Sequence, residues 1–379
     1  MTIGVLLSRS TDYPTMGFDL LDGLRIKLNC EGISDVRFVP ENIGFGEDKK
    51  EVYAKAEKLL LQDEADIIVG YLSPVNAALL HPLLDAAGKK LIVLDAGMNF
   101  PSEGPGVNAI HISLQGLHAS YFSGKKAGEN SNKVIMATSF YDGGYRGPWA
   151  YHRGVQDAGG AIVGNYVAHY KESQFTIAPF LEVVNTNTDS SVAACFSTYL
   201  SSLFVKALHG QNDALQQLDF HCSSFMFEEQ IASSYALPAG RFYAYTPWLS
   251  MLDNPDNIIF TNEILERKGK KANIFHLLGW EAGIVAAHLL QQTQHSNAPL
   301  KELLAGWSYE SPRGKVTIHP DTHFAFAPLY YAEMSRTPGE GVNISILDKL
   351  EIDAAEHLRM MNDQPTGVTS GWFNHYLCT

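Results

Sequence analysis

Long apolar segments and an excess of basic residues are both missing from the sequence. It contains no run of about 18 apolar residues, the length that a membrane-spanning helix requires. Lys and Arg number 28 against 41 Asp and Glu, which gives a formal net charge of -13. Nucleic acids and anionic membrane surfaces attract clustered basic side chains. The composition therefore predicts a protein that neither spans a membrane nor binds nucleic acid.

Cysteine is also scarce, and its spacing fits neither a zinc site nor a disulfide framework. The four scattered thiols are Cys30, Cys195, Cys222 and Cys378. We expect them to be independent and inert, since free cysteine is among the most buried residue types. A predicted strand begins almost at the first residue, without the basic and apolar regions of a secretory signal peptide. Either a signal segment is not included in this sequence or the protein is cytosolic.

Motifs of common enzyme classes are absent. The sequence contains no GxGxxG, GxxxxGK[ST], HExxH or GxSxG. The glycine-rich stretch 143–147 lacks the spacing that lets a backbone approach a pyrophosphate. His319 and His323 lie close in sequence, but Pro320 and polar neighbours predict a surface turn rather than a metal site. We therefore expect no catalytic residues, no metal and no cofactor.

Residues 65–99 organise the first part of the chain. Segments 66–70 and 91–95 are short apolar runs without alternation, the pattern of parallel strands covered on both faces. Between them, segment 77–87 repeats leucines at helical spacing. In such a βαβ unit, ligands bind at the turns that follow the carboxyl ends of the strands. Those turns carry Ser73, Asn76, Asp95, Met98 and Asn99.

The alternation of strands and helices occurs twice. It fills about the first 113 residues, restarts near residue 117 and continues to about residue 244. A chain of 379 residues is also too long for one ordinary hydrophobic core. The predicted fold class is therefore α/β, with two doubly wound units. Further strands and helices are expected beyond residue 244, including a long helix over 273–292.

The predicted strand-end turns share small hydroxyl, amide and aromatic residues and contain few Lys, His or Cys. These residues are Ser73, Asn76, Asn99, Tyr141, Tyr145, Trp149, Thr198, Tyr199, Ser223 and Trp248. Hydroxyls and amides orient a small polar ligand while aromatic rings bury its apolar part. The alternative is that they are ordinary turn residues and half-buried aromatics. Their common position at strand ends favours a ligand site.

Several stretches, in order over about residues 3–334, resemble the type I periplasmic binding proteins. They are strands 3–7, 66–70 and 91–95, the turn at 145–147, and the stretch 311–322, which reads SPRGKVTIHPDT. The resemblance is to the leucine/isoleucine/valine-binding group and its urea and short-chain amide relatives. It implies two Rossmann-like lobes joined by a three-crossing hinge that closes on the ligand like a Venus flytrap. On this basis lobe 1 comprises 1–115 plus 247–323, lobe 2 comprises 116–246 plus 324–347, and 348–379 form a helix and tail.

The resemblance also implies which positions hold the ligand. The first lobe should offer Ser73 and the backbone of Gly97 and Met98; the second should offer Tyr145, Thr198 or Tyr199, and Ser223 or Ser224. Asp95 could bind a ligand ammonium, or be solvated or bonded to backbone. Amino-acid receptors of the family have a run of Ser and Thr after the equivalent strand. Here that turn reads Ser-Pro-Val-Asn at 73–76, which argues against an α-amino acid.

The function implied is a non-enzymatic solute receptor of an ABC-type uptake system. Its partners would be a small polar ligand (an amino acid, amide or urea-like compound) and an ABC permease, and its location would be periplasmic. The alternative is a cytosolic amide or amino-acid sensor of the same fold that regulates a partner protein. The absence of a recognisable signal peptide favours this alternative.

Overall fold

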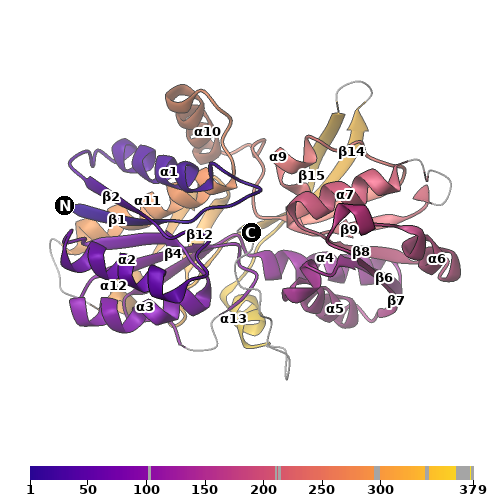
Figure 1. Cartoon of the computed structure of the whole chain (residues 1–379), viewed down its shortest axis with the longest axis horizontal. Coiled ribbons are helices and arrows are strands. Elements are labelled where there is room, and N and C mark those ends of the chain that lie inside the picture. Colours follow the sequence, from indigo (N-terminus) through magenta and orange to yellow (C-terminus); the bar gives the residue numbers. More distant parts are fainter. Residues whose placement is uncertain are drawn as a thin grey trace.

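The computed structural model describes residues 1–100, 104–209, 211, 215–293, 299–337, 341–363 and 376. Cys378, Trp372 and most of the predicted tail lie outside these residues. Two lobes stand side by side, and the last described helix lies below their junction (Figure 1). The chain passes between them three times, which confirms the predicted two-lobed α/β fold class.

The first lobe is built on a five-stranded parallel sheet of order β2-β1-β3-β4-β5. Its strands are β1 (Thr2–Leu7), β2 (Arg37–Asn42), β3 (Ile67–Tyr71), β4 (Lys90–Asp95) and β5 (Ala109–Ser113). The helices between them are α1 (Met16–Cys30), α2 (Lys49–Leu61) and α3 (Pro74–Ala87). Every residue of β3 and β5 is buried. The unalternating apolar runs in the sequence are thus the central parallel strands, as predicted.

A later segment of the chain completes the first lobe. It supplies α10 (Pro255–Lys268), α11 (Ile274–Thr293), α12 (Leu300–Leu304) and the strands β11 (Ser308–Ser311), β12 (Gly314–Ile318) and β13 (Ala325–Phe326). These three strands form an antiparallel sheet. A bridge between His111 of β5 and Phe324 joins it to the first sheet, and their rings stack at 4.1 Å.

The second lobe is built on a seven-stranded sheet of order β15-β14-β10-β9-β8-β6-β7. Its strands are β6 (Lys133–Ser139), β7 (Ala161–Ala168), β8 (Ser191–Cys195), β9 (Asp219–Cys222), β10 (Arg241–Thr246), β14 (Leu329–Thr337) and β15 (Gly341–Leu350). Its helices are α4 (Gly116–Asn130), α5 (Gly147–Asp157), α6 (Ala178–Thr186), α7 (Thr198–Leu208) and α9 (Glu229–Ala232), with short 3-10 turns η1 (Asp142–Gly144), η2 (Glu172–Gln174) and η3 (Ser224–Phe227). β6 to β10 are parallel, whereas β14 and β15 extend the sheet in antiparallel fashion.

The passages between lobes lie at residues 114–115, 247–254 and 327–328, between β5 and α4, β10 and α10, and β13 and β14. Below them, α13 (Ala354–Asn362) contacts elements of both lobes. The His357 ring of α13 stacks on His118 of α4 and on Phe326 of β13. This helix therefore packs beside the hinge.

In each lobe, two helices touch backbone to backbone through a pair of glycines. A Cβ atom added to Gly23 of α1 would lie 2.2 Å from the carbonyl oxygen of His276, and one added to Gly279 of α11 would lie 2.0 Å from that of Leu20. Likewise, a Cβ added to Gly124 of α4 would lie 2.3 Å from the carbonyl oxygen of Tyr151 in α5. One added to Gly154 of α5 would lie 2.0 Å from that of Tyr121 in α4. Only glycine fits at these four positions.

Two details differ from the sequence-based expectations. Helix α10 was not predicted, although Asn254 caps it, Pro255 opens it and Gly269 follows it at φ +66°. His319 and His323 close the predicted turn at 320–322, whose Asp321 is exposed, but their own side chains are buried, and the His323 ring approaches the carbonyl oxygens of residues 106 and 109. Of the helices that the structure describes, none is both long and apolar enough to cross a membrane.

Candidate ligand site between the lobes

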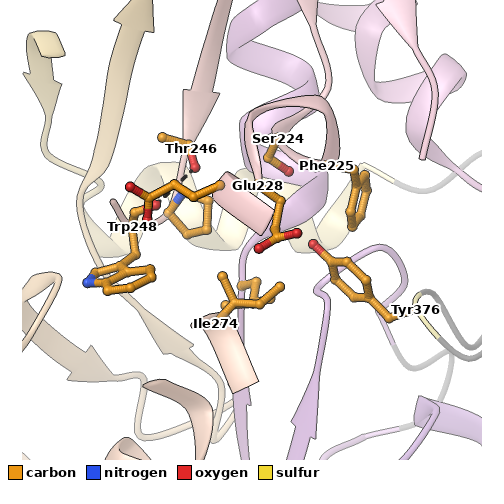
Figure 2. Close-up of a pocket in the computed structure, with 10 residues that line it drawn as sticks. Ser224, Phe225, Glu228, Thr246, Trp248, Ile274 and Tyr376 are labelled. Atoms are coloured by element: carbon orange, nitrogen blue, oxygen red, sulfur yellow. Dashed lines mark hydrogen bonds between the residues drawn. The ribbon is translucent and has the colours of Figure 1, made fainter. Parts of the chain in front are cut away.

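A small buried cavity lies where the two lobes meet (Figure 2). The second lobe lines it with η3 and the start of α9, the first lobe with the start of α11, and the hinge with residues of two passages. The lining side chains are Leu114, Ser224, Phe225, Glu228, Glu229, Thr246, Pro247, Trp248, Ile274 and Tyr376. The space left among them is about 10 Å³, room for about one water molecule.

A hydrogen bond beside this cavity joins the lobes directly. Tyr13, in the loop after β1, donates its hydroxyl to Glu228 Oε2 at 2.9 Å. Both residues are buried. Glu228 also caps α9, since its Oε1 accepts from the Gln230 N–H at 3.2 Å. Burial raises the pKa of the Glu228 carboxyl above its usual value.

The loop that carries Tyr13 is shaped by a serine. Ser10 Oγ accepts a hydrogen bond from the Tyr13 N–H at 3.0 Å, which closes a turn before α1. The same hydroxyl donates to the carbonyl oxygen of Tyr376 at 2.5 Å. The hydroxyl-rich turn noted in the sequence therefore positions Tyr13 against the second lobe.

The predicted residues after β3 are held within the first lobe. Ser73 caps α3, where its Oγ accepts from the Asn76 N–H at 3.2 Å. Asn76 in turn donates its side-chain amide to the carbonyl oxygen of Gly46. Both side chains are buried, so the turn after β3 is well ordered by its own hydrogen bonds.

After β4, the Gly97 N–H donates to Asp95 Oδ1 at 2.6 Å. The other oxygen, Asp95 Oδ2, has no hydrogen-bond partner among the described residues. Burial raises the pKa of Asp95 to about 7. The sequence left open whether Asp95 binds a ligand ammonium, water or backbone. The structure shows the bond to backbone for Oδ1, while Oδ2 can still accept a hydrogen bond.

Met98 reaches across the junction. Its side chain is buried, and a Cβ added to Gly147, at the start of α5 in the second lobe, would lie 3.1 Å from Met98 Cε. The same Cβ would lie 2.9 Å from Cys195 Sγ. Met98 therefore fills the space between the ends of β4 and β8, where Gly147 leaves room for it.

In the second lobe, Tyr141 and Tyr145 share a hydrogen bond of 2.7 Å between their hydroxyls, and their rings meet edge to face. Between them in sequence, Asp142 accepts hydrogen bonds from Ser139 Oγ at 2.7 Å and Ser197 Oγ at 2.5 Å. Burial raises the pKa of Asp142 to about 7, against the effect of these two hydroxyls. Asp142 thereby ties the end of β6 to the end of β8, a role that the sequence did not indicate.

The remaining predicted residues divide between the cavity and its surroundings. Ser224 and Trp248 line the cavity, and Trp248 Nε1 donates to Asn257 Oδ1 at 2.8 Å. Ser223 Oγ instead donates to the Phe196 carbonyl at 2.5 Å. Thr198 is buried at φ +41°, whereas Tyr199 is 43% exposed. Among the described residues, the other predicted positions do not line this cavity.

Three features of the site were not identified from the sequence. Tyr13 belonged to a turn that was noted without a role, Glu228 follows a short 3-10 turn rather than a strand, and Tyr376 lies far along the chain. The only sequence signal was the hydroxyl-rich turn that carries Tyr13. The other two depend on tertiary contacts.

Solved structures similar to this chain share its two-lobed fold. A solute-binding protein of an ABC transporter from Rhodopseudomonas palustris BisB5, in complex with 3,4-dihydroxy benzoic acid, has a TM-score of 0.72 at 17% identity, over 93% of this chain and 97% of the other. A solute-binding protein from R. palustris in complex with 4-hydroxybenzoate has a TM-score of 0.69 at 18% identity, over 93% and 97%. A leucine-binding protein from Thermotoga maritima has a TM-score of 0.64 at 13% identity, over 93% of this chain and 99% of the other. Identities this low show the fold alone.

The sequence comparison shows the family. No curated protein matches the sequence. The profile of the periplasmic binding proteins matches residues 1–339, which is most of the chain and includes both sheets. By its sequence over these residues and by its fold, the chain belongs to the periplasmic binding protein family.

Proposed function

We propose that this chain is the solute-binding receptor of an ABC-type uptake system and holds one small ligand between its lobes. The observation that carries the proposal is the cavity whose wall combines both lobes and the hinge, beside the Tyr13–Glu228 hydrogen bond. A ligand in this position contacts both lobes when they are closed and only one when they are open. It therefore shifts the equilibrium toward the closed form by its differential affinity.

The wall of the cavity favours a ligand with an apolar or aromatic part. Phe225, Trp248, Ile274 and Leu114 offer apolar surface, while Glu228 offers a buried acceptor. Hydroxylated benzoic acids, as bound by two of the similar proteins, combine these features. The amino acids, amides and urea-like compounds expected from the sequence remain candidates, and leucine matches the apolar part best.

We propose binding without catalysis. Glu228 is engaged by Tyr13 and by the backbone of its own helix, so it serves as an acceptor rather than as a free general base. The receptor should release its ligand chemically intact. Mass spectrometry of a bound compound after prolonged incubation tests this, and time-dependent loss that a Glu228→Gln substitution abolishes would contradict it.

We further propose a periplasmic location and an ABC permease as partner. Both follow from the family to which the chain belongs. Genes for a permease and an ATPase beside the gene for this chain would support transport, whereas a neighbouring regulator gene would support the sensing alternative.

A ligand panel tests the receptor proposal itself. Leucine, valine, urea, acetamide, benzoate, 4-hydroxybenzoate and 3,4-dihydroxybenzoate are added separately, and the melting temperature and small-angle scattering profile are measured. A binding compound should raise the melting temperature by mass action and reduce the radius of gyration. If no compound changes either quantity, the proposed ligand classes are wrong. If a compound raises the melting temperature without compaction, the flytrap mechanism is wrong.

A further inference from the structure

Tyr376 lies inside the cavity between the lobes although it is far from both lobes in sequence. It is only 3% exposed. It is separated from α13 by residues 364–375, which lie outside the described part of the chain. Figure 2 shows its ring entering the space between η3 of the second lobe and the start of α11 in the first. A side chain of the protein itself thus stands where a ligand would contact both lobes.

Three aromatic rings receive Tyr376 edge to face. Tyr13 lies at 5.3 Å and 79°, and Phe275 at 5.4 Å and 82°, both from the first lobe. Phe225, from the second lobe, lies at 4.9 Å and 68°. Edge-to-face contacts of this kind contribute ~0.5–1.5 kcal/mol each beyond burial. The cleft is therefore shaped to accept a six-membered aromatic ring.

Polar groups meet the two ends of the tyrosine. Its hydroxyl points toward the Glu228 carboxylate (Figure 2). Burial first, and the Glu228 charge second, raise the pKa of the Tyr376 hydroxyl well above its usual value, so it is a neutral phenol beside an acceptor. Its carbonyl oxygen accepts the Ser10 hydroxyl at 2.5 Å. Both lobes thus hold this one residue.

With Tyr376 in place, no second ring fits. The remaining space is about 10 Å³, whereas a cavity that binds benzene measures roughly 150 Å³. A ligand that carries a ring can occupy this position only after Tyr376 has left. The tyrosine and such a ligand are mutually exclusive.

We propose that the cleft is a site for a phenolic ring, that Tyr376 is its internal occupant, and that a free phenolic ligand binds by displacing it. This inference rests on the proposed receptor function and names its ligand class. A residue attached to the same chain competes at a high effective concentration, so the apparent affinity for free ligand is reduced to the intrinsic affinity multiplied by the fraction of time the site is open.

The first test compares affinities of full-length variants. Tyr376→Ala removes the occupant, and Tyr170→Ala serves as the control because Tyr170 is 45% exposed on the second lobe. Isothermal titration with 4-hydroxybenzoate should give a dissociation constant about tenfold lower for Tyr376→Ala than for wild type, with Tyr170→Ala unchanged. An unchanged constant overturns the proposal. A weaker one also overturns it, because Tyr376 would then be a wall of the site rather than its occupant.

The second test follows the residue itself. With 3-fluorotyrosine at position 376 of the full chain, the fluorine resonance should be protected from a soluble paramagnetic agent without ligand and become exposed when 4-hydroxybenzoate is added. Equal exposure in both states overturns the displacement.

Failure of this inference can be told from failure of the receptor function. If wild type binds any compound of the panel while Tyr376→Ala binds 4-hydroxybenzoate no tighter, the receptor stands and the internal occupant is wrong. If neither variant binds any compound although both melt cooperatively, the receptor proposal fails and this inference fails with it.

Discussion

Gln115 and Ala327 are joined by a pair of hydrogen bonds that links two of the three passages between the lobes. Gln115 Nε2 donates to the Ala327 carbonyl at 3.1 Å, and its Oε1 accepts from the Ala327 N–H at 2.8 Å. Arg313, which is fully buried, donates to the Ser113 carbonyl at 2.9 Å on the same side. Glu281 holds its guanidinium through two bonds of 2.7 and 2.8 Å. These hydrogen bonds therefore couple the first passage to the third.

Replacing Gln115 should destabilise the hinge. Gln115→Ala leaves the buried N–H and carbonyl of Ala327 without partners, and position 115 has φ +52°. We expect the free energy of unfolding in urea to fall by ~1–3 kcal/mol. Gln174→Ala, at an exposed position, is the control and should change little. Equal stability of the two variants would show that the paired amide contributes nothing.

Removing the hydroxyl of Tyr13 should favour the open form. Tyr13→Phe keeps the ring beside Phe275 but deletes the bond to Glu228, which joins the lobes. A hydrogen bond to a charged group contributes ~1.5–3 kcal/mol, and it exists only when the lobes are closed. Small-angle scattering of the ligand-free variant should give a larger radius of gyration than wild type. Tyr170→Phe is the control, and identical profiles for Tyr13→Phe and wild type would argue against this bond as a latch.

Asp95 should make stability depend on pH. Its pKa is raised from the usual 3.8 to about 7 by burial, so the folded state keeps a proton that the unfolded state releases between these values. The contribution of Asp95 to the free energy of unfolding then decreases as pH rises from about 4 to about 7, and levels off above. Asp95→Asn should lose this contribution. The free energy of unfolding of wild type should therefore fall relative to that of Asp95→Asn as pH rises over that interval. Asp35→Asn, at an exposed position, is the control; a constant difference for Asp95→Asn would contradict the prediction.

The turns after β3 and β6 carry predicted ligand contacts that lie outside the cavity between the lobes, so substitutions there test where the ligand binds. A ligand in the cavity should bind Ser73→Ala and Tyr145→Ala with unchanged affinity, whereas a ligand that contacts these turns should lose ~1–3 kcal/mol of binding in each, the cost of an unpaired buried group. Because Ser73 caps α3, its substitution should also cost ~1 kcal/mol of stability, whereas the sequence alone suggested almost none. Calorimetric titration is compared with Ser173→Ala and Tyr170→Ala, both at exposed positions. Unchanged affinity in both test variants would move the ligand site away from these turns.

Much of the fold follows from local patterns in the sequence. The short unalternating runs of β3 and β4 indicated buried parallel strands, and the apolar spacing between them indicated a helix. The antiparallel direction of β14 and β15 was not predicted, since pairing direction depends on which strand lies next in space. Helix α10 was missed although its capping residues were readable.

The candidate site was less predictable because its walls come from distant segments. Ser224 and Trp248 were predicted and line the cavity. Tyr13 and Glu228, which bond across it, are 215 residues apart, and Ser10 and Tyr376 are 366 apart. No spacing rule connects such pairs, since only the closed arrangement of the lobes brings them together. Asp142 escaped notice for the same reason, because its second hydroxyl partner follows another strand.

The glycine pairs in the two lobes have a mechanical consequence. Where α1 meets α11, and where α4 meets α5, the main chains come into direct contact at the paired glycines, which locks each helix pair in one position. We therefore expect each lobe to resist internal shear and to turn as a rigid body about the passages. A small torsion at residues 327–328 is magnified into a wide arc at the far rim of each lobe, and spectroscopic labels attached there would report ligand capture with the greatest sensitivity.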